Sequence, residues 1–119
     1  HLINGLPGET EDMMLETAPA AGLLRPGGVK IHLLHVLSGT RLAREWENGA
    51  VPTLTREEYI RIVCRQLLRL PPETVVERLT GDGAKEFLLA PLWSRDKIAV
   101  LGGIDRFLAE HNLCQGCLF

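Results

Sequence analysis

The sequence predicts an α/β fold built around parallel strands. An apolar strand at residues 1–4, a helix beginning near Thr10 and a second apolar strand at residues 29–36 follow one another along the chain. A helical crossover between two strands requires them to pair in parallel. The nearly continuous apolar run of residues 29–36 is typical of a strand covered on both faces. A βαβ unit with such a strand places the chain in the α/β class rather than the α+β class.

The opening strand leads directly into a turn in which Gly5 and Gly8 bracket Leu6 and Pro7. A strand needs a hydrogen-bonding neighbour, and no methionine or leader precedes this one, so we expect the chain to be the second part of a larger domain. Chemistry encoded upstream would then lie outside these residues. An unpaired strand edge also tends to pair with another chain, so we expect the fragment to self-associate.

Acidic residues mark the start of the first helix. Glu9, Glu11 and Asp12 lie where the partial positive charge of a helix N-terminus favours negative side chains, which predicts a helix from about Thr10. Pro19 is expected to limit or kink this helix, because proline lacks the amide hydrogen of the helical ladder. The Pro-Gly-Gly sequence at residues 26–28 then separates the helix from the second strand.

Further helix signals occupy the middle of the chain. Thr40 is predicted to cap a short helix that ends at Gly49. Thr55 and Glu58 have the spacing of a capping box, which begins an amphipathic helix that runs until the proline pair at residues 71–72. The β-branched residues of segment 74–80 predict a third strand, followed by a turn at residues 81–83.

The last part of the sequence combines an interrupted apolar segment with a final helix. Residues 87–93 are apolar but contain Pro91, which predicts a buried irregular segment or an edge strand. Ser94 and Asp96 precede the final helix, which contains Gly102 and Gly103. Each glycine costs a helix about 1 kcal/mol relative to alanine, so close packing against a neighbour is the expected reason for both.

The composition is that of a soluble globular domain. Of the 119 residues, 45% are hydrophobic and 24% are charged, and 13 basic against 15 acidic residues give a net charge of -2. That balance creates no strong field for phosphate backbones or anionic lipid. The apolar stretches are far shorter than the roughly 20 residues that span a bilayer. Three cysteines form no closed disulfide framework, so we expect a cytoplasmic protein without membrane contact.

The glycine turn and the cysteines have structural interpretations. Backbone amides of the turn at residues 5–9 lie where an anionic ligand can bind a helix N-terminus. The turn lacks the G-x-G-x-x-G spacing, however, which favours a structural role and disfavours a nicotinamide-binding half-domain. Cys114 and Cys117 form a C-x-x-C without a second cysteine pair for zinc, and Cys64 falls on the apolar face of a helix. We predict no metal site in these residues.

Two histidines and a polar cluster are the candidate ligand contacts. The strand spacing points His32 and His35 to opposite faces, so they are not expected to share a metal. For each of them a hydrogen-bonded core position is the simpler interpretation, but a histidine that points into a barrel would be available to substrate or cofactor. Arg78, Thr80 and Asp82 surround the end of the third strand, where α/β folds bind ligands, although an ordinary solvated turn is an equal alternative.

Several segments together resemble one family. Residues 1–10 (HLINGLPGET) resemble the fifth-strand motif of radical S-adenosylmethionine (SAM) enzymes, especially the branch of oxygen-independent coproporphyrinogen oxidase and the elongator catalytic subunit. Residues 29–40 are similar to the sixth strand and its glycine-threonine turn. Segments 78–83 and 90–94 resemble a bacterial radical SAM group often labelled Fe-S oxidoreductases. His1 replaces the usual first glycine of the fifth-strand motif.

This resemblance implies the C-terminal portion of a partial (β/α)6 TIM-like barrel with an accessory extension. Residues 1–50 would be its last two strand-helix units and residues 51–119 the extension. In the family, a C-x-x-x-C-x-x-C loop holds a [4Fe-4S] cluster that cleaves SAM to a 5'-deoxyadenosyl radical for hydrogen abstraction. A flavodoxin or ferredoxin would supply electrons, and the substrate is unknown. This sequence lacks the cysteine loop, so the fragment alone is predicted to be inactive and to hold no cofactor.

The same resemblance assigns roles to individual residues. In the family the fifth-strand motif packs against adenine, and residues leaving the sixth strand lie close by. The implied cofactor contacts are Ile3, Gly5, Leu34, His35 and Val36. The candidate substrate contacts are His32, Arg78 and Asp82. The alternative from another class is a free-standing βαβ module that binds a nucleotide or a protein without catalysis.

Overall fold

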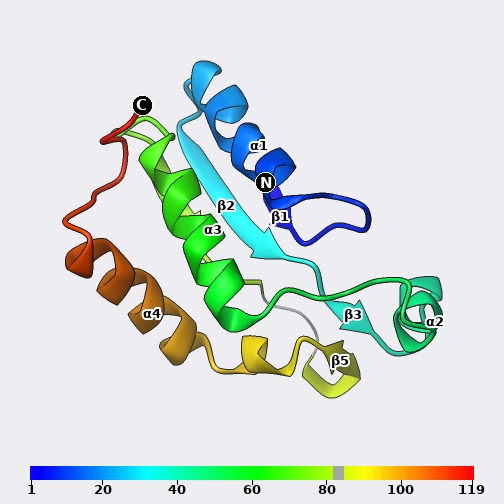
Figure 1. Cartoon of the computed structure of the whole chain (residues 1–119). Helices are drawn as coiled ribbons and strands as arrows, with labels where there is room; N and C mark the ends of the chain where they lie inside the picture. The colour runs from blue at the N-terminus through cyan, green and yellow to red at the C-terminus, as the bar shows by residue number, and fades with distance from the viewer. Residues whose placement is uncertain (82–84) are drawn as a thin grey trace.

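Three parallel strands form the centre of the fold, in a computed structural model that describes residues 1–81 and 85–119 (Figure 1). The strands lie in the order β1 (Leu2–Asn4), β2 (Gly28–Leu33) and β4 (Val75–Arg78). Leu2 lies opposite Ile31 across the first ladder, and β4 extends the sheet on the other side of β2. The predicted α/β class with parallel pairing is therefore confirmed.

Two helices cover one face of this sheet. α1 (Glu11–Leu23) connects β1 to β2, α3 (Arg56–Leu68) precedes β4, and both lie on the same side of the sheet in Figure 1. α4 (Lys97–Glu110) packs against α3. One hydrophobic core joins these elements and runs in sequence from Leu2 to Ile104. The two regions predicted on either side of residue 50 therefore share a core within this chain.

The opposite face of the sheet carries exposed side chains. Residues of β2 alternate between buried and more exposed positions along the strand. On the neighbouring strands, Ile3 is 44% exposed and Val75 is 61% exposed. The apolar run of residues 29–36 predicted cover on both faces, but helices from the described part of the chain cover only one. We call the side of the sheet that carries Ile3, Lys30, His32 and Val75 the open face.

The second predicted strand divides into two. β2 ends at Leu33, and β3 (Val36–Leu37) pairs antiparallel with β5 (Leu88–Ala90). Of the two alternatives predicted for residues 87–93, a buried irregular segment or an edge strand, the structure has a short strand before Pro91. Short 3₁₀ turns at Lys85–Phe87 and Leu92–Arg95 flank β5, and α2 (Arg41–Glu47) packs beside β3. A second small cluster holds this region together and consists of Val36, Ala43 and Ala90.

The helices begin at the predicted caps. Four capping side chains each accept a hydrogen bond from the backbone amide three residues later, and they belong to Thr10, Thr40, Thr55 and Asp96. The capping box of Thr55 and Glu58 is complete. Pro19 lies inside α1, which continues to Leu23, so this proline does not end the helix.

Close packing accounts for only one of the two glycines in α4. A Cβ atom at Gly103 would collide with Cδ1 of Ile60 on α3, so the helices approach closely there. A Cβ atom at Gly102 would meet nothing within 4 Å. The prediction that packing explains both glycines is therefore wrong for Gly102.

The C-terminal tail folds back onto the end of α3. The amides of Gly116 and Leu118 donate to the carbonyls of Leu67 and Leu68, at 3.0 and 2.9 Å. The side-chain nitrogen of Gln115 donates to the carbonyls of Pro71 and Thr74, at 2.9 and 2.7 Å. The bonds to Leu67 and Leu68 reach carbonyls in the last turn of α3, where the helix itself supplies no partner, and the Gln115 bonds hold the tail to the segment that follows the helix.

The three cysteines are free thiols. Cys114 and Cys117 are exposed in the tail, whereas Cys64 is buried in the core. The Cys64 thiol lies 3.7 Å from the Ile104 carbonyl, and burial raises the pKa of this thiol to about 12. The prediction that Cys64 is a small core residue is confirmed.

Candidate functional site

The C-terminal ends of β1 and β2 lie side by side and bring together several residues predicted to contact a cofactor. Ile3 is the register partner of His32, and the Leu34 amide donates to the Asn4 carbonyl at 2.8 Å. Parallel α/β folds bind ligands at this end of their strands, because the loops that follow the strands converge there.

Gly5 links this strand end to α1 with a backbone conformation that favours glycine. Its φ is +90°, and its amide lies 3.3 Å from the sulfur of Met14. A Cβ atom at this position would lie 3.4 Å from Leu54 and 3.8 Å from Leu34. The loop of residues 5–9 and segment 52–54 border a cavity of about 230 Å³. Gly5 and Leu34, two of the predicted cofactor contacts, are therefore neighbours.

His32 lies on the open face among positive charges. Burial, and next the charges of Arg78 and Lys30, lower the pKa of His32. The ring centroid of His1 lies 5.2 Å from that of His32. Since an unperturbed histidine already titrates below neutral pH, His32 is uncharged at pH 7 and offers one donor and one acceptor.

His35 occupies a separate position after β2. A Cβ atom built on Gly81 would lie 2.8 Å from its Cε1, so the imidazole rests against the backbone that follows β4. The Nε2 atom is buried and has no hydrogen-bond partner among the described residues. Burial, and next the charge of Lys97, lower the pKa of His35. Residues 1–81 and 85–119 contain no group of side chains that could hold a metal ion.

Of the other predicted contacts, Arg78 lies close enough to His32 for its charge to lower the pKa of that histidine, whereas Val36 lies elsewhere. Val36 is fully buried between α2 and β5, away from the Ile3–Gly5 strand end. Arg78 is the last residue of β4 and the register partner of Lys30. Asp82 lies outside the described residues.

A buried pair of amides behind this strand end was missed by the sequence reasoning. Asn4 Nδ2 donates to Gln66 Oε1 at 2.9 Å, and Gln66 Nε2 donates to Asn4 Oδ1 at 2.8 Å. The sequence does contain a hint of this pair, because both residues are polar at positions that are otherwise apolar. Asn4 ends an apolar strand, and Gln66 falls on the buried side of an amphipathic helix.

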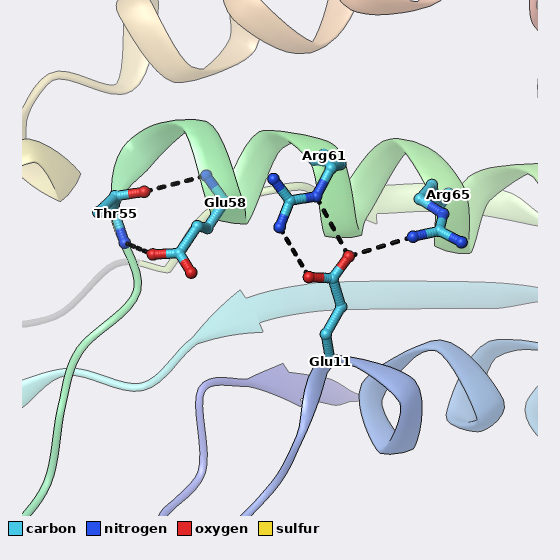
Figure 2. Close-up of polar contacts among 5 residues, drawn as sticks. All are labelled: Glu11, Thr55, Glu58, Arg61 and Arg65. Atoms are coloured by element: carbon cyan, nitrogen blue, oxygen red, sulfur yellow. Dashed lines mark hydrogen bonds and ion pairs between the residues drawn. The ribbon is translucent and has the colours of Figure 1, made fainter.

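An ion cluster joins the start of α1 to α3 (Figure 2). Glu11 accepts hydrogen bonds from Nε and Nη2 of Arg61, at 3.2 and 2.7 Å, and from Nη1 of Arg65 at 3.1 Å. The hydrogen bond from Arg61 is the largest cause that lowers the pKa of Glu11. The cluster therefore fixes the helix that follows the Gly5 loop to the helix that carries Gln66.

This cluster makes stability depend on pH. Because the folded pKa of Glu11 lies below its ordinary value of 4.5, the ion pairs stabilise the fold above that pH. The contribution is lost as the pH falls through the folded pKa. Glu11→Gln is expected to cost up to about 1 kcal/mol at pH 7, since partly exposed pairs are screened by solvent. Urea denaturation should show that the free energy of unfolding of Glu11→Gln differs less from that of the wild type at pH 3 than at pH 7.

A more exposed pair provides the control for this measurement. Glu73 pairs with Arg25 at 2.7 Å, with both side chains more than half exposed. Glu73→Gln is expected to change stability at pH 7 less than Glu11→Gln does. A difference between wild type and Glu11→Gln that stays constant on acidification would contradict a stabilising role for the cluster.

No helix in the described part of the chain combines the length and the apolar character needed to cross a membrane.

Together, the strand ends, the glycine loop and the open face can contact a ligand with an apolar surface and hydrogen-bonding edges.

Comparison with known proteins places these features in a family context. Residues 26–110 match the model of the radical SAM C-terminal domain. The chain is 46% identical, over 119 residues, to the uncharacterised protein YtqA of Bacillus subtilis. It is 33% identical over 113 residues to the protein YhcC of Escherichia coli. These matches cover 100% and 95% of this chain, but only 37% of each relative.

A solved structure shares the fold. An N-terminally truncated archaeal Elp3 of Methanocaldococcus infernus superimposes with a TM-score of 0.74 and 18% sequence identity. The match covers 95% of this chain and 26% of that protein. The chain thus spans little more than a third of the curated relatives and about a quarter of the solved protein.

Proposed function

This chain belongs to the radical SAM C-terminal domain family, and from that premise we propose that it forms one wall of the SAM site in a longer radical SAM enzyme. The wall comprises the ends of β1 and β2 with the Gly5 loop. The intact enzyme would use SAM and a [4Fe-4S] cluster to abstract hydrogen from its substrate. A flavodoxin or ferredoxin as electron donor belongs to the same proposal.

The open face of the parallel sheet is the observation that carries this proposal. Parallel sheets are normally covered on both faces, because their crossover helices and neighbouring layers enclose them. In a (β/α) barrel, helices cover the outer face while the inner face lines the interior. Ile3 is apolar yet 44% exposed, on the face that no helix of the described residues covers. An interior position in a barrel completed by other residues would cover it.

The residues of this wall fit the nucleoside part of SAM. Ile3 offers an exposed apolar surface on which an aromatic base can pack, and it lies next to the uncharged His32. Gly5 keeps the backbone free of a side chain where the strand turns toward α1. Lys30 lies on the same face but outside this wall, where it pairs with Glu77 at 3.8 Å. When bound, SAM would supply the chemistry of hydrogen abstraction, whereas these residues orient it and exclude water.

The described residues do not fit an iron–sulfur cluster. A [4Fe-4S] cluster in this family needs three converging thiolates. Cys64 is buried in the core, and the two exposed cysteines lie in the tail against the end of α3. Cluster ligands would have to come from residues outside this chain.

Substitution of Ile3 tests the proposal. In the longer protein that carries this sequence, Ile3→Asp is expected to weaken SAM binding at least about tenfold, because a carboxylate would replace the apolar surface under the base. In the 119-residue chain the same change should leave stability nearly unaltered, because the side chain is exposed. Calorimetric titration with SAM and urea denaturation measure the two effects.

Val75 provides a matched control on the same face. It is also exposed and apolar, but it begins β4, at the opposite end of the sheet from the strand ends described above. Val75→Asp is expected to leave SAM affinity unchanged. Failure of the wild-type protein to bind SAM would overturn the proposed function. An equal loss of SAM affinity in Ile3→Asp and Val75→Asp would show that the wall is not at the ends of β1 and β2.

A further inference from the structure

Gln66 belongs to a polar junction inside the core in which every side-chain nitrogen and oxygen atom has a hydrogen-bond partner. Gln66 and Asn4 are each 1% exposed, and their amides bond to each other in both directions. Gln66 Nε2 also donates to the Met14 carbonyl at 2.9 Å. The junction therefore joins α3 to β1 and to α1 through one side chain.

Such a junction specifies position more than it adds stability. A buried amide left without a partner is costly, but replacing both partners by apolar groups of similar shape is often nearly neutral. Two apolar side chains can slide past each other, whereas the two hydrogen bonds between these side-chain amides fix both the distance and the relative orientation of Asn4 and Gln66. The paired amides thus hold the end of β1 in one register against α3.

The fixed strand end carries the proposed cofactor contacts. Asn4 stands between Ile3 and Gly5, and its carbonyl accepts the Leu34 amide at 2.8 Å. The Gly5 amide lies 3.3 Å from the sulfur of Met14, the same residue whose carbonyl Gln66 binds. Any displacement of Asn4 is transmitted directly to both of its neighbours, because they share its peptide bonds.

We infer that Gln66 is a positioning residue for the SAM nucleoside, acting through Asn4 without touching the ligand. The inference rests on the proposed function of the Ile3–Gly5 wall. It assigns to α3, a helix of the predicted C-terminal extension, a part in forming the cofactor site.

Three variants of the longer protein separate positioning from stability. Gln66→Leu keeps the volume but leaves the buried Asn4 amide without its partner. The double variant Asn4→Val with Gln66→Leu replaces the whole pair by apolar side chains. Val63→Ala, in the same helix and core, damages packing without touching the amide pair. For each protein we would measure the SAM dissociation constant, the free energy of unfolding in urea, and hydrogen exchange at the Gly5 amide without SAM.

The expected pattern distinguishes the two roles. Gln66→Leu should weaken SAM binding about tenfold, which corresponds to the loss of one hydrogen bond. The same variant should increase the rate of hydrogen exchange at the Gly5 amide. The double variant should recover stability but not SAM affinity or Gly5 protection. Val63→Ala should lose stability while its SAM affinity stays within about twofold of wild type.

Other outcomes decide against the inference or against its premise. Wild-type affinity in Gln66→Leu, or recovery of affinity in the double variant, would show that Gln66 has only a structural role. A wild-type protein that binds no SAM would overturn the proposed function instead. In that case Gly5 exchange still decides whether Gln66 fixes the loop, because unchanged exchange in Gln66→Leu would overturn the positioning role itself.

Discussion

Tyr59→Ala is expected to lower the free energy of unfolding by about 3–5 kcal/mol, the range for truncating a large aromatic side chain in a core. Tyr59 is completely buried in α3, and its ring centroid lies 5.4 Å from that of Trp93. Its hydroxyl donates to the Leu79 carbonyl at 2.6 Å, just beyond β4. Burial raises the pKa of this phenol far above its ordinary value, so the hydroxyl stays a donor at all ordinary pH values.

Tyr59→Phe separates the hydrogen bond from the packing. This change removes only the hydroxyl and leaves the Leu79 carbonyl without that donor, so a cost of about 1–3 kcal/mol is expected. Urea or thermal denaturation of both variants at pH 7 measures the difference. If Tyr59→Phe were as damaging as Tyr59→Ala, the hydrogen bond rather than the ring would dominate. If neither variant changed stability, α3 would not be anchored through Tyr59.

Gly116→Ala is expected to release the C-terminal tail and to cost about 2–4 kcal/mol, from backbone strain together with overpacking. Gly116 has a φ of +79°, and a Cβ atom there would lie 2.7 Å from Cδ and 2.8 Å from N of Pro72. The nitrogen of Pro72 is a backbone atom, so it cannot move away from the added Cβ atom as the end of a flexible side chain could. Relief of the clash would break the tail's hydrogen bonds to Leu67 and Leu68.

Gly49→Ala is the matched control for the tail variant. Gly49 has nearly the same φ, +77°, but a Cβ atom there would meet nothing within 4 Å. It should therefore show only the conformational cost of about 1–2 kcal/mol. Urea denaturation gives the two costs, and limited proteolysis reports whether the tail has detached. Equal losses in the two variants, with an intact tail, would contradict a packing role for the Pro72 contact.

Local signals in the sequence predicted the helices well, because helix starts depend on a few adjacent residues. The Thr55–Glu58 capping box and the Asp96 cap are formed by side chains and amides only three residues apart. The parallel pairing of β1 and β2 also followed from a short crossover. Proximity of Gly5 to Leu34 is a consequence of that pairing, since both leave neighbouring strands at the same edge.

Features that depend on distant segments were not predictable in the same way. The chain leaves β2 after Leu33 because β3 has a different partner, β5, which lies much later in the sequence. Asn4 and Gln66 are 62 positions apart, so only the fold shows that their amides meet. The tail bonds to α3 likewise join segments whose local sequences carry no common pattern. The role of Asp82 remains a prediction outside the described residues.

A ligand bound at the open face would also raise the thermal stability of the chain. A molecule that binds the native sheet but not the unfolded chain shifts the unfolding equilibrium by mass action, by about 2.7 kcal/mol at a hundred times its dissociation constant. Ile3 and Val75, which now contact solvent, would lose that contact under any cover of the face. The melting temperature of this chain should therefore rise with the concentration of any molecule or neighbouring segment that covers the open face.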